Sequence, residues 1–402
     1  MTKKIKLLRP LVPNSLANPI LSIVVPALNE EITITEFVDW CKVGLSEAGI
    51  QGQILIVDSS SDETPQLAIA GGAEVLLVPK RGLGRAYIDA IPFIRGKWVL
   101  MGDADLTYDF RKLSPFIAKF KAGREFIMGS RFKGYIERGA MPLLHQYFGT
   151  PLTTWILNFL YRTRFTDIHC GMRGITLDAL KKINLESQGW EYASEMVLKA
   201  ARYHLKIGEV PVAFFKDRAG RVSHHRRMGW ISPWIAGWTN LRVMLVYTPD
   251  SFLIKPGIIS MLLGLVISTP LIFGPISFAG MGFDLYTMLL GLSLSVFGYA
   301  IFQVGIISRL IHGYRSGIEI FIQKKLTYNN GIIISIILIF IGIIFELLFL
   351  ENYLSNGLRV NFISYTAIEG LLLILVGVQT FGFTLIVELI NISMTKKELY
   401  AK

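Results

Sequence analysis

The sequence has little cysteine, because only Cys41 and Cys170 occur among its 402 residues. Two cysteines exclude a disulfide-based scaffold, and in a reducing cytosol we expect both to be free thiols. A secretory signal peptide is not expected either, since Arg9 and two prolines interrupt the apolar run of the basic N-terminal segment, residues 1–20. The chain also lacks an obvious Ser/His/Asp or Cys/His set, so a side-chain nucleophile is not indicated.

Charged residues are nearly absent from the C-terminal part of the chain. Three apolar segments there carry no charged side chain and a fourth carries only Glu346: residues 256–283, 285–308, 370–387 and 331–350. With 52% hydrophobic residues and a mean hydropathy of +0.47, the chain is too apolar for an ordinary soluble protein of this size. A bilayer core of ~30 Å needs ~20 helical residues. The sequence therefore predicts four membrane helices, near 253–274, 285–308, 331–350 and 367–391.

Basic residues indicate the orientation of these helices. Lys and Arg gather before the first helix, between the second and third, and after the last, whereas residues 275–284 have none. This alternation fits the positive-inside rule, so we expect a multi-pass integral membrane protein with its N-terminal region and its C-terminus in the cytoplasm. We interpret the net charge of +11 as serving to attract anionic lipid headgroups and phosphate ligands rather than nucleic acid.

The first 250 residues predict an α/β fold. Short apolar runs alternate with helical patterns. The apolar runs lie at 21–26, 53–58, 73–78, 97–103 and 125–130. The helical patterns lie near 32–48, 63–71, 83–95 and 111–122. This alternation favours a mostly parallel sheet. Polar clusters follow all five runs, and since ligands bind at the carboxyl ends of such strands, we expect five loops to converge on one rim. Further along we expect a helix, a loop, and a helix followed by a strand, over 143–164, 167–174 and 189–215.

Asp103 and Asp105 follow the fourth apolar run, in the stretch GDADLTYDF. Close carboxylates repel each other and need a counter-charge. Mg²⁺ or Mn²⁺ takes one or two carboxylates and fills its remaining sites with water and substrate phosphates. An Asp-X-Asp pair also often caps a helix or a turn, so the motif alone leaves both interpretations open. Asp109, in the same stretch, is interpreted as the start of the next helix.

Two other segments at the rim are ambiguous in the same way. Asp58 is suited to accept a hydrogen bond from a nucleobase edge, of uracil or guanine, or else to cap the next helix. The stretch RGLGR, residues 81–85, places Arg81 and two glycines at a helix start, where backbone N–H groups can approach phosphate. Such glycines more commonly mark a turn.

Six motifs occur in a fixed order before the membrane helices: VVPALNEE, VDSSSDET, GDADLTYDF, GSRF, DIHCGMRG and EVPVAFFKDRAGRVSH. Over residues 21–223 this arrangement resembles the family 2 glycosyltransferases that load polyprenyl phosphate, such as dolichyl-phosphate mannose synthase. The resemblance implies an α/β, GT-A-type nucleotide-sugar-binding domain followed by an all-α membrane domain of four transmembrane helices. It implies metal-dependent, inverting transfer of a hexose from a nucleoside-diphosphate sugar, UDP- or GDP-linked, to dolichyl or undecaprenyl phosphate at the cytoplasmic face of the membrane.

The resemblance also assigns roles to individual residues. Together with Arg81 from the RGLGR stretch, the residues expected at the nucleotide sugar are Pro26, Asn29, Glu30, Asp58, Asp103, Arg218, Arg221 and Ser223. Asp103 and Asp105 would bind Mg²⁺ or Mn²⁺ with the donor diphosphate, and Arg131 of GSRF would hold the acceptor phosphate; these three form the expected catalytic set. Arg218, Arg221, Ser223 and His224 match a mobile segment that closes over the diphosphate in the family.

Three departures from the family pattern leave questions open. Val57 stands in place of the first of two adjacent acids, so only Asp58 is available. Thr107 stands where a Gln is common and is a further candidate metal ligand, through its hydroxyl or a water. No arginine occurs in the helical stretch after GSRF, so His145 or Arg138 would have to supply the second basic group for the acceptor phosphate, and the sequence does not choose between them.

The expected domains are an N-terminal segment, a catalytic domain, a basic and amphipathic juxtamembrane segment, the four membrane helices and a cytoplasmic tail, over residues 1–20, 21–215, 216–250, 251–392 and 393–402. In the juxtamembrane segment Trp230, Trp234 and Trp238 fall on one helical face. That face is either part of a core or an interfacial helix lying on the headgroups.

Two other functions would each leave a mark in the sequence. Polysaccharide synthases and other lipid glycosyltransferases of the same superfamily commonly carry Gln-x-x-Arg-Trp before the membrane segments, which RRMGW at 226–230 does not match. A transporter, or a scaffold with a degenerate transferase domain, would be marked by ionisable groups at the membrane midplane. Glu346, Glu369 and Glu388 lie instead near predicted helix ends.

Overall fold

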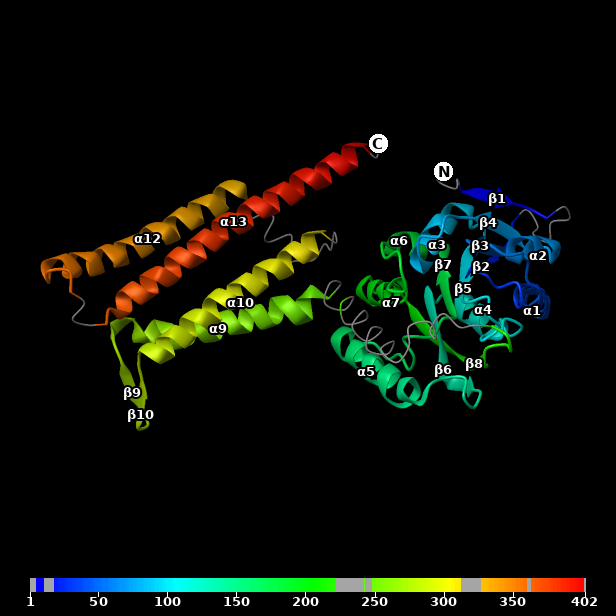
Figure 1. Ribbon diagram of the computed structural model, residues 1–402, viewed down its shortest axis with the longest axis horizontal. Coiled ribbons are helices and arrows are strands. Elements are labelled where there is room, and N and C mark those ends of the chain that lie inside the picture. Colours follow the sequence, from blue (N-terminus) through cyan, green and yellow to red (C-terminus); the bar gives the residue numbers. More distant parts are fainter. Residues whose placement is uncertain are drawn as a thin grey trace. The chain divides into compact units, whose positions relative to one another are not determined.

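Figure 1 shows the computed structural model of the chain, which describes residues 5–10, 18–221, 242, 248–311, 327–359 and 363–400, the last with side chains to residue 393. The chain divides into two compact units, Met1–Met244 and Leu245–Lys402. The expected site residues Ser223 and His224, and the tryptophans at 230, 234 and 238, lie outside the described residues.

The described residues of the first unit form one eight-stranded sheet. Its strands are β1 (Lys6–Leu8), β2 (Leu21–Ala27), β3 (Gly52–Asp58), β4 (Glu74–Leu77), β5 (Trp98–Met101), β6 (Phe126–Ile136), β7 (Arg173–Thr176) and β8 (Ile207–Phe214). They lie in the order β1-β4-β3-β2-β5-β7-β6-β8. All run in one direction except β1 and β7, which pair antiparallel with their neighbours. The predicted mostly parallel α/β sheet is confirmed.

Helices cover both faces of this sheet, which explains the continuous apolar runs of its central strands. The helices are α1 (Ile34–Glu47), α2 (Thr64–Ala70), α3 (Leu83–Ala90), α4 (Ser114–Lys121), α5 (Thr150–Tyr161), α6 (Leu177–Ile183) and α7 (Tyr192–Arg202). Figure 1 shows α1 and α2 on one side of the sheet and α3, α6 and α7 together on the other. Ile23, Val24 and Val25 of β2 and Leu55 and Ile56 of β3 are fully buried between these layers.

The structure corrects three local expectations. The fifth apolar run continues as a strand to Ile136, because β6 pairs with β8 beyond the end of β7, so Arg131 lies within a strand and not in a loop after it. The predicted loop 167–174 ends in the short strand β7. Asp109 does not start a helix: it accepts a hydrogen bond from the backbone of Arg111 and pairs with its guanidinium, and α4 begins only at Ser114.

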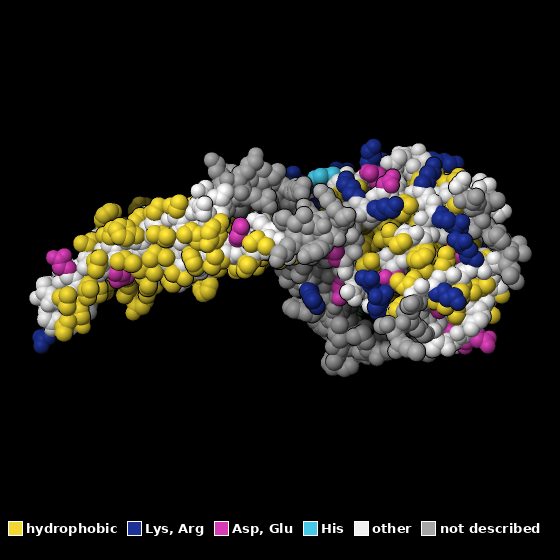
Figure 2. Space-filling model, turned by 90° about the horizontal axis from the view of Figure 1, so that it is seen from above, with side chains coloured by type: hydrophobic (Ala, Val, Ile, Leu, Met, Phe, Trp, Pro, Cys, Tyr) yellow, Lys and Arg dark blue, Asp and Glu magenta, His cyan; other side chains and the backbone are white. Residues whose placement is uncertain are grey.

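The described residues of the second unit include four helical spans that are long and apolar enough to cross a membrane, at Asp250–Phe273, Leu285–Ile311, Tyr328–Ser355 and Tyr365–Ser393. They comprise η4 (Asp250–Ile254), α9 (Lys255–Ser268) and η5 (Thr269–Phe273), then α10 (Leu285–Ile311), α12 (Tyr328–Ser355) and α13 (Tyr365–Tyr400). The unpredicted strands β9 (Ile276–Phe278) and β10 (Met281–Phe283) form a hairpin between the first two spans. Figure 2 shows the surface of this unit covered by apolar side chains, as lipid exposure requires.

Glycines let these helices approach closely in two pairs. A Cβ added at Gly264 of α9 would lie 2.4 Å from the Gly291 carbonyl of α10, and one at Gly342 of α12 would lie 2.6 Å from the Gly370 carbonyl of α13. Such contacts between small residues are typical of helices that pack in lipid. Tyr299 of α10 and Thr380 of α13 share a hydrogen bond of 2.8 Å, which joins the two pairs.

Candidate active site

Asp103 and Asp105 follow the carboxyl end of β5, as the sequence predicted. The Oδ1 atom of Asp105 accepts hydrogen bonds from Thr107, at 3.0 Å from its backbone N–H and at 2.6 Å from its hydroxyl. Leu106 between them adopts a left-handed backbone with φ of 63°, which turns the chain sharply. Thr107 therefore orients Asp105 in this structure. No described residue donates a hydrogen bond to Asp103.

Ionisation of both Asp103 and Asp105 is unfavourable when no cation is bound beside them. Burial, and then the neighbouring charge of Asp105, raise the pKa of Asp103 to about 7. Burial likewise raises the pKa of Asp105, although Arg221 and the Thr107 hydrogen bonds oppose the rise. Two neighbouring, half-buried carboxyl groups that resist ionisation are the arrangement that a bound cation would stabilise.

Arg221 lies against the acid pair in this structure. Its guanidinium donates to both oxygens of Glu30, at 2.6 and 2.7 Å, and its Nη1 lies 3.4 Å from Asp105 and 2.6 Å from Asp217. Burial opposes the charge of Arg221, but Glu30 and the two aspartates outweigh it and raise its pKa. The structure thus brings together three residues that are expected at the donor diphosphate, Glu30, Asp105 and Arg221. The positively charged guanidinium of Arg221 lies between the carboxylates of Glu30 and Asp105.

Arg173 is a second cation beside Asp103, and no role for it was predicted from the sequence. Its side chain is 1% exposed, and it donates to the carbonyls of Cys170 at 2.8 Å and Ala193 at 2.5 Å. Its charge lowers the pKa of Asp103. Arg173 belongs to the quoted DIHCGMRG motif, so a signal was present, but nothing in the spacing indicates that β7 carries it to the acid pair.

The loops after β2 and β3 are joined by short polar contacts. The backbone N–H of Asn29 donates to the Ser60 hydroxyl at 2.7 Å, and Asn29 Oδ1 accepts from the Ser61 N–H at 3.0 Å. Ser60 in turn donates to both oxygens of Asp58, which is 1% exposed. Asp58 therefore stabilises a turn in this structure and does not cap α2, whose N-cap is Glu63. Pro26, also expected at the nucleotide, is half-buried in β2.

Arg81 and the glycines of RGLGR are engaged elsewhere. Arg81 donates to the buried Asp89 at 2.6 Å. The first backbone N–H groups of α3, at residues 84 and 85, donate to carbonyls at 189 and 188, so they are not available to phosphate. A Cβ at Gly84 would lie 2.1 Å from the Ser187 carbonyl, which shows that the glycine permits close packing of residues 187–189. Of the two interpretations of these glycines, this packing favours the turn, and contact of Arg81 with the nucleotide sugar stays a prediction.

Arg131 forms a buried ion pair with Asp167. Its Nε and Nη2 donate to the two carboxylate oxygens at 2.7 and 2.8 Å, and both side chains are almost fully buried. Burial opposes the charge of Arg131, but Tyr108 and Asp167 outweigh it and raise the pKa. The pair also lowers the pKa of Asp167 against the opposing effect of burial. Arg131 is therefore held permanently charged in one orientation.

His145 and Arg138, the two alternatives for a second basic group, differ in their surroundings. His145 begins η2 (His145–Gly149), and it lies close enough to His169 to lower the pKa of that imidazole, as Arg131 also does. Arg138 is exposed. Arg218, expected at the donor, forms an exposed ion pair with Glu36.

The acid pair fits a divalent cation only as a partial ligand set. Among residues 5–10, 18–221 and the described part of the second unit, no three His, Cys, Asp or Glu side chains cluster closely enough to hold a metal ion. Mg²⁺ and Mn²⁺ commonly take one or two carboxylates, with water and substrate phosphate completing the shell. The oxygens that would serve are those of Asp103, to which no described residue donates a hydrogen bond, and Asp105 Oδ2, which lies 3.4 Å from Arg221 Nη1.

Comparison with known proteins identifies the family. Residues 22–184 match the profile of glycosyl transferase family 2. The chain is 30% identical over 366 residues to the low-salt glycan biosynthesis hexosyltransferase Agl6 of Haloferax volcanii, an alignment that covers 90% of this chain and 86% of that protein. It is 29% identical over 175 residues to a dolichyl-phosphate hexose transferase of the same organism, covering 43% of this chain and 73% of that one. Among solved structures, glucosyl-3-phosphoglycerate synthase from Mycobacterium tuberculosis aligns with 56% of this chain and 80% of its own, at 20% identity and a TM-score of 0.43. The chain belongs to the family 2 glycosyltransferases.

Proposed function

We propose that this family 2 glycosyltransferase transfers a hexose from a nucleoside-diphosphate sugar to polyprenyl phosphate at the cytoplasmic face of the membrane, with inversion at the anomeric carbon. The main support is the half-buried pair Asp103 and Asp105 at the carboxyl end of β5, beside Arg221 and Arg173. This pairing of acids and arginines suits a ligand that carries a diphosphate and a divalent cation.

The reaction requires charge neutralisation more than proton transfer. An oxygen of the acceptor phosphate attacks the anomeric carbon, the bond from that carbon to the diphosphate breaks, and the nucleoside diphosphate leaves with the electron pair. A phosphate monoester has a second pKa of ~6, so the acceptor is largely ionised at neutral pH and needs little help from a general base. The absence of a catalytic triad among the predicted site residues is consistent with this chemistry.

The chain's own residues then have distinct tasks. Asp103 and Asp105 hold the Mg²⁺ or Mn²⁺ that, when bound, stabilises negative charge on the leaving diphosphate. Arg221 and Arg218 contact the diphosphate from the segment after β8. Arg131, locked by Asp167, holds the acceptor phosphate in a fixed position, which lowers the entropic part of the barrier.

The membrane helices suit a lipid acceptor. Each CH₂ group moved from lipid into water costs ~0.8 kcal/mol, so a polyprenyl chain stays in the bilayer and the enzyme must work at its surface. Four spans long enough to cross the membrane would keep the catalytic unit there.

The test uses membranes that contain the full chain, polyprenyl phosphate, Mg²⁺ or Mn²⁺, and a panel of labelled UDP- and GDP-sugars. We expect one donor to label the lipid and Asp105→Asn to abolish the labelling. The proposal fails if no donor labels the lipid, or if Asp105→Asn labels it as well as the unmodified chain does. Label that enters a polymer instead of the lipid would favour a polysaccharide synthase.

A further inference from the structure

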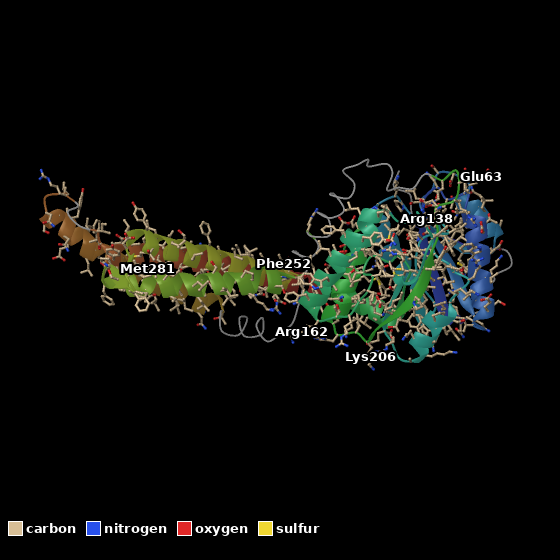
Figure 3. The ribbon with its side chains drawn as sticks, turned by 90° about the horizontal axis from the view of Figure 1, so that it is seen from below. Glu63, Arg138, Arg162, Lys206, Phe252 and Met281 are labelled. Atoms are coloured by element: carbon tan, nitrogen blue, oxygen red, sulfur yellow. The ribbon has the colours of Figure 1, made fainter. Side chains whose placement is uncertain are left out.

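A pocket of about 290 Å³ lies among the four helical spans of the second unit. Its walls come from both helix pairs, α9 with α10 and α12 with α13. Figure 3 labels Phe252, at the start of the first span, and Met281, in the hairpin beyond its end, and the pocket lies among the helices between these two positions. Most of the lining side chains are apolar, among them Met261, Leu265, Ile334, Leu338, Leu372 and Val376. The pocket therefore suits an apolar molecule.

One polar group in this pocket lacks a protein partner. Glu369 is 6% exposed, and no described residue forms a hydrogen bond with its Oε2 atom, although the buried Ser268 lies beside the carboxyl group. The other polar side chains of the lining are paired: Tyr299 and Thr380 share a hydrogen bond, and Ser295 donates to a backbone carbonyl. Buried polar atoms are rarely left unpaired, so Oε2 should have a partner that is not part of the protein.

Neither a protein cation nor water suits Glu369 as that partner. Among the described residues that line the pocket, none is Lys, Arg or His. A buried water needs about two to four polar partners, and the apolar walls offer few beside this carboxyl group. An ion pathway would need further acids along it, but neither Glu346 nor Glu388 lines the pocket. Acidic groups at membrane depth commonly mark a binding site. The partner is therefore the polar group of a ligand whose apolar part fills the pocket.

The position of Glu369 along α13 indicates how such a ligand is oriented. Glu369 lies about 6 Å along the axis from the start of the helix at Tyr365, and Thr380, which also lines the pocket, lies about 16 Å further along. One leaflet contributes half of a hydrocarbon core that is ~30 Å thick. A lipid of one leaflet would thus place its headgroup at Glu369, near the helix end, and its chain along the pocket towards the bilayer centre.

The carboxyl group also selects the kind of headgroup. An ionised carboxylate only accepts hydrogen bonds, so a hydroxyl or an amine can donate to Oε2. A phosphate would bring a second negative charge beside it without a cation to separate the two. Polyprenyl phosphate, the proposed acceptor, is therefore a poor ligand for this pocket.

We propose that this pocket binds one single-chain lipid whose headgroup, a hydroxyl or an amine, donates a hydrogen bond to Glu369. Because both helix pairs line the pocket, the bound chain packs against both and stabilises their association. The inference does not depend on the reaction that is proposed for the catalytic unit.

The test is native mass spectrometry of the full chain released from detergent micelles. Hexadecan-1-ol, hexadecylamine, hexadecane or hexadecyl phosphate is added at equal concentration, so that the chain is constant and only the headgroup varies. The test variants are Glu369→Leu, which removes the carboxyl group, and Val376→Phe, which fills part of the pocket. The matched control is Glu388→Leu, since Glu388 belongs to the same helix but does not line the pocket. Glu369→Leu removes an unpaired acid from apolar surroundings, so the variant should fold.

We expect one alcohol or amine bound to each chain, with binding at least ~10-fold weaker in Glu369→Leu and in Val376→Phe and unchanged in Glu388→Leu. Added hexadecan-1-ol should also raise the unfolding temperature of the unmodified chain and not that of Glu369→Leu. The proposal is overturned if neither the alcohol nor the amine binds, or if Glu369→Leu binds them as well as the unmodified chain does. Equal binding of hexadecane or of hexadecyl phosphate would likewise overturn it, because the carboxyl group would then select no headgroup.

Discussion

The guanidinium of Arg221 binds both carboxylate oxygens of Glu30, at 2.6 and 2.7 Å, and lies 3.4 Å from Asp105. Arg221 and Glu30 are 191 positions apart in the chain. The guanidinium lies between Glu30 and Asp105, where a positive charge offsets the repulsion between the two carboxylates. In the proposed reaction, a diphosphate with its cation would compete for the same groups. Arg221 therefore links the segment after β8 to the state of the donor site.

Replacing Arg221 should weaken donor binding. In Arg221→Gln the site loses a charge that is held by three carboxylates, so we expect the KM for the nucleotide sugar to rise ~10- to 100-fold, equivalent to about 1.4 to 2.8 kcal/mol. Steady-state kinetics at varied donor concentration would measure it. Lys112→Gln, which removes an exposed cation paired with Glu47, is the control and should change KM less than ~2-fold. An unchanged donor KM in Arg221→Gln would remove the assigned role.

Asp103→Asn should separate stability from activity. Because burial and Asp105 raise the pKa of Asp103 to about 7, the ionised group is unfavourable at pH 8 without a cation. We expect the variant to lose activity at least ~100-fold while its unfolding free energy in metal chelator rises on the order of 2 kcal/mol. Thermal unfolding at pH 8 and lipid labelling are the two measurements. A destabilised or an active variant would contradict the assignment.

Asp167→Asn tests the positioning of Arg131. The variant keeps the shape of the side chain but removes the charge that orients the guanidinium, so the KM for polyprenyl phosphate should rise ~10-fold with the donor KM unchanged. Since a buried ion pair is broken, the unfolding free energy should fall by ~3 kcal/mol. Asp39→Asn, at an exposed pair with Lys42, should cost less than ~0.5 kcal/mol and serves as comparison. Equal effects on both KM values would indicate a purely structural role.

Gly171→Ala tests how tightly the site is built around Asp103. A Cβ at this position would lie 2.6 Å from Asp103 Oδ2 and 3.0 Å from the Tyr108 ring, so the carboxylate must move. If Asp103 binds the metal as proposed, displacement of its oxygen by a fraction of an ångström should lower kcat at least ~10-fold. The control is Gly382→Ala in α13, where an added Cβ meets nothing within 4 Å. Normal kcat in Gly171→Ala would show that Asp103 tolerates displacement.

His169 should make stability depend on pH in mildly acidic solution. Burial lowers the pKa of its imidazole to about 4, from an ordinary value of 6.5, against the opposing charge of Asp167. The other charged groups that act on it are Arg131, Arg173 and His145. Between pH 6.5 and 4 the unfolded chain therefore binds more protons than the folded one, so this contribution to stability is complete above pH 6.5 and falls as the pH drops, by up to ~3 kcal/mol.

The measurement is the difference in unfolding temperature between pH 7.5 and pH 5. That difference should be smaller in His169→Gln, which keeps a polar group near Thr153 but does not titrate. The exposed His204 provides the control, since His204→Gln should leave the difference as it is in the unmodified chain. An unaltered pH dependence in His169→Gln would mean that the imidazole is accessible to protons when folded.

Short-range patterns in the sequence predicted most of the architecture. The membrane spans follow from runs with almost no charged residue, with errors of up to five residues at their ends, and β2 to β5 follow from apolar runs at the expected spacing, with errors of up to two residues. Asp103 and Asp105 were found because a strand end and a carboxylate pair are both visible within seven positions. Each of these signals depends on residues that are close together in the chain.

Only the tertiary structure decided which charges meet. The pairs Arg131–Asp167 and Arg221–Glu30 join residues 36 and 191 positions apart, and Arg173 reaches the acid pair only because β7 inserts antiparallel between β5 and β6. Helix α5 was predicted, but which of its faces is buried, the one with Thr150 and Thr154, depends on how it packs against other elements such as α7. The periodicity of apolar residues in the sequence determines that a helix or strand has an apolar face. Burial and long-range electrostatics, which act through space and not along the chain, determine what that face meets.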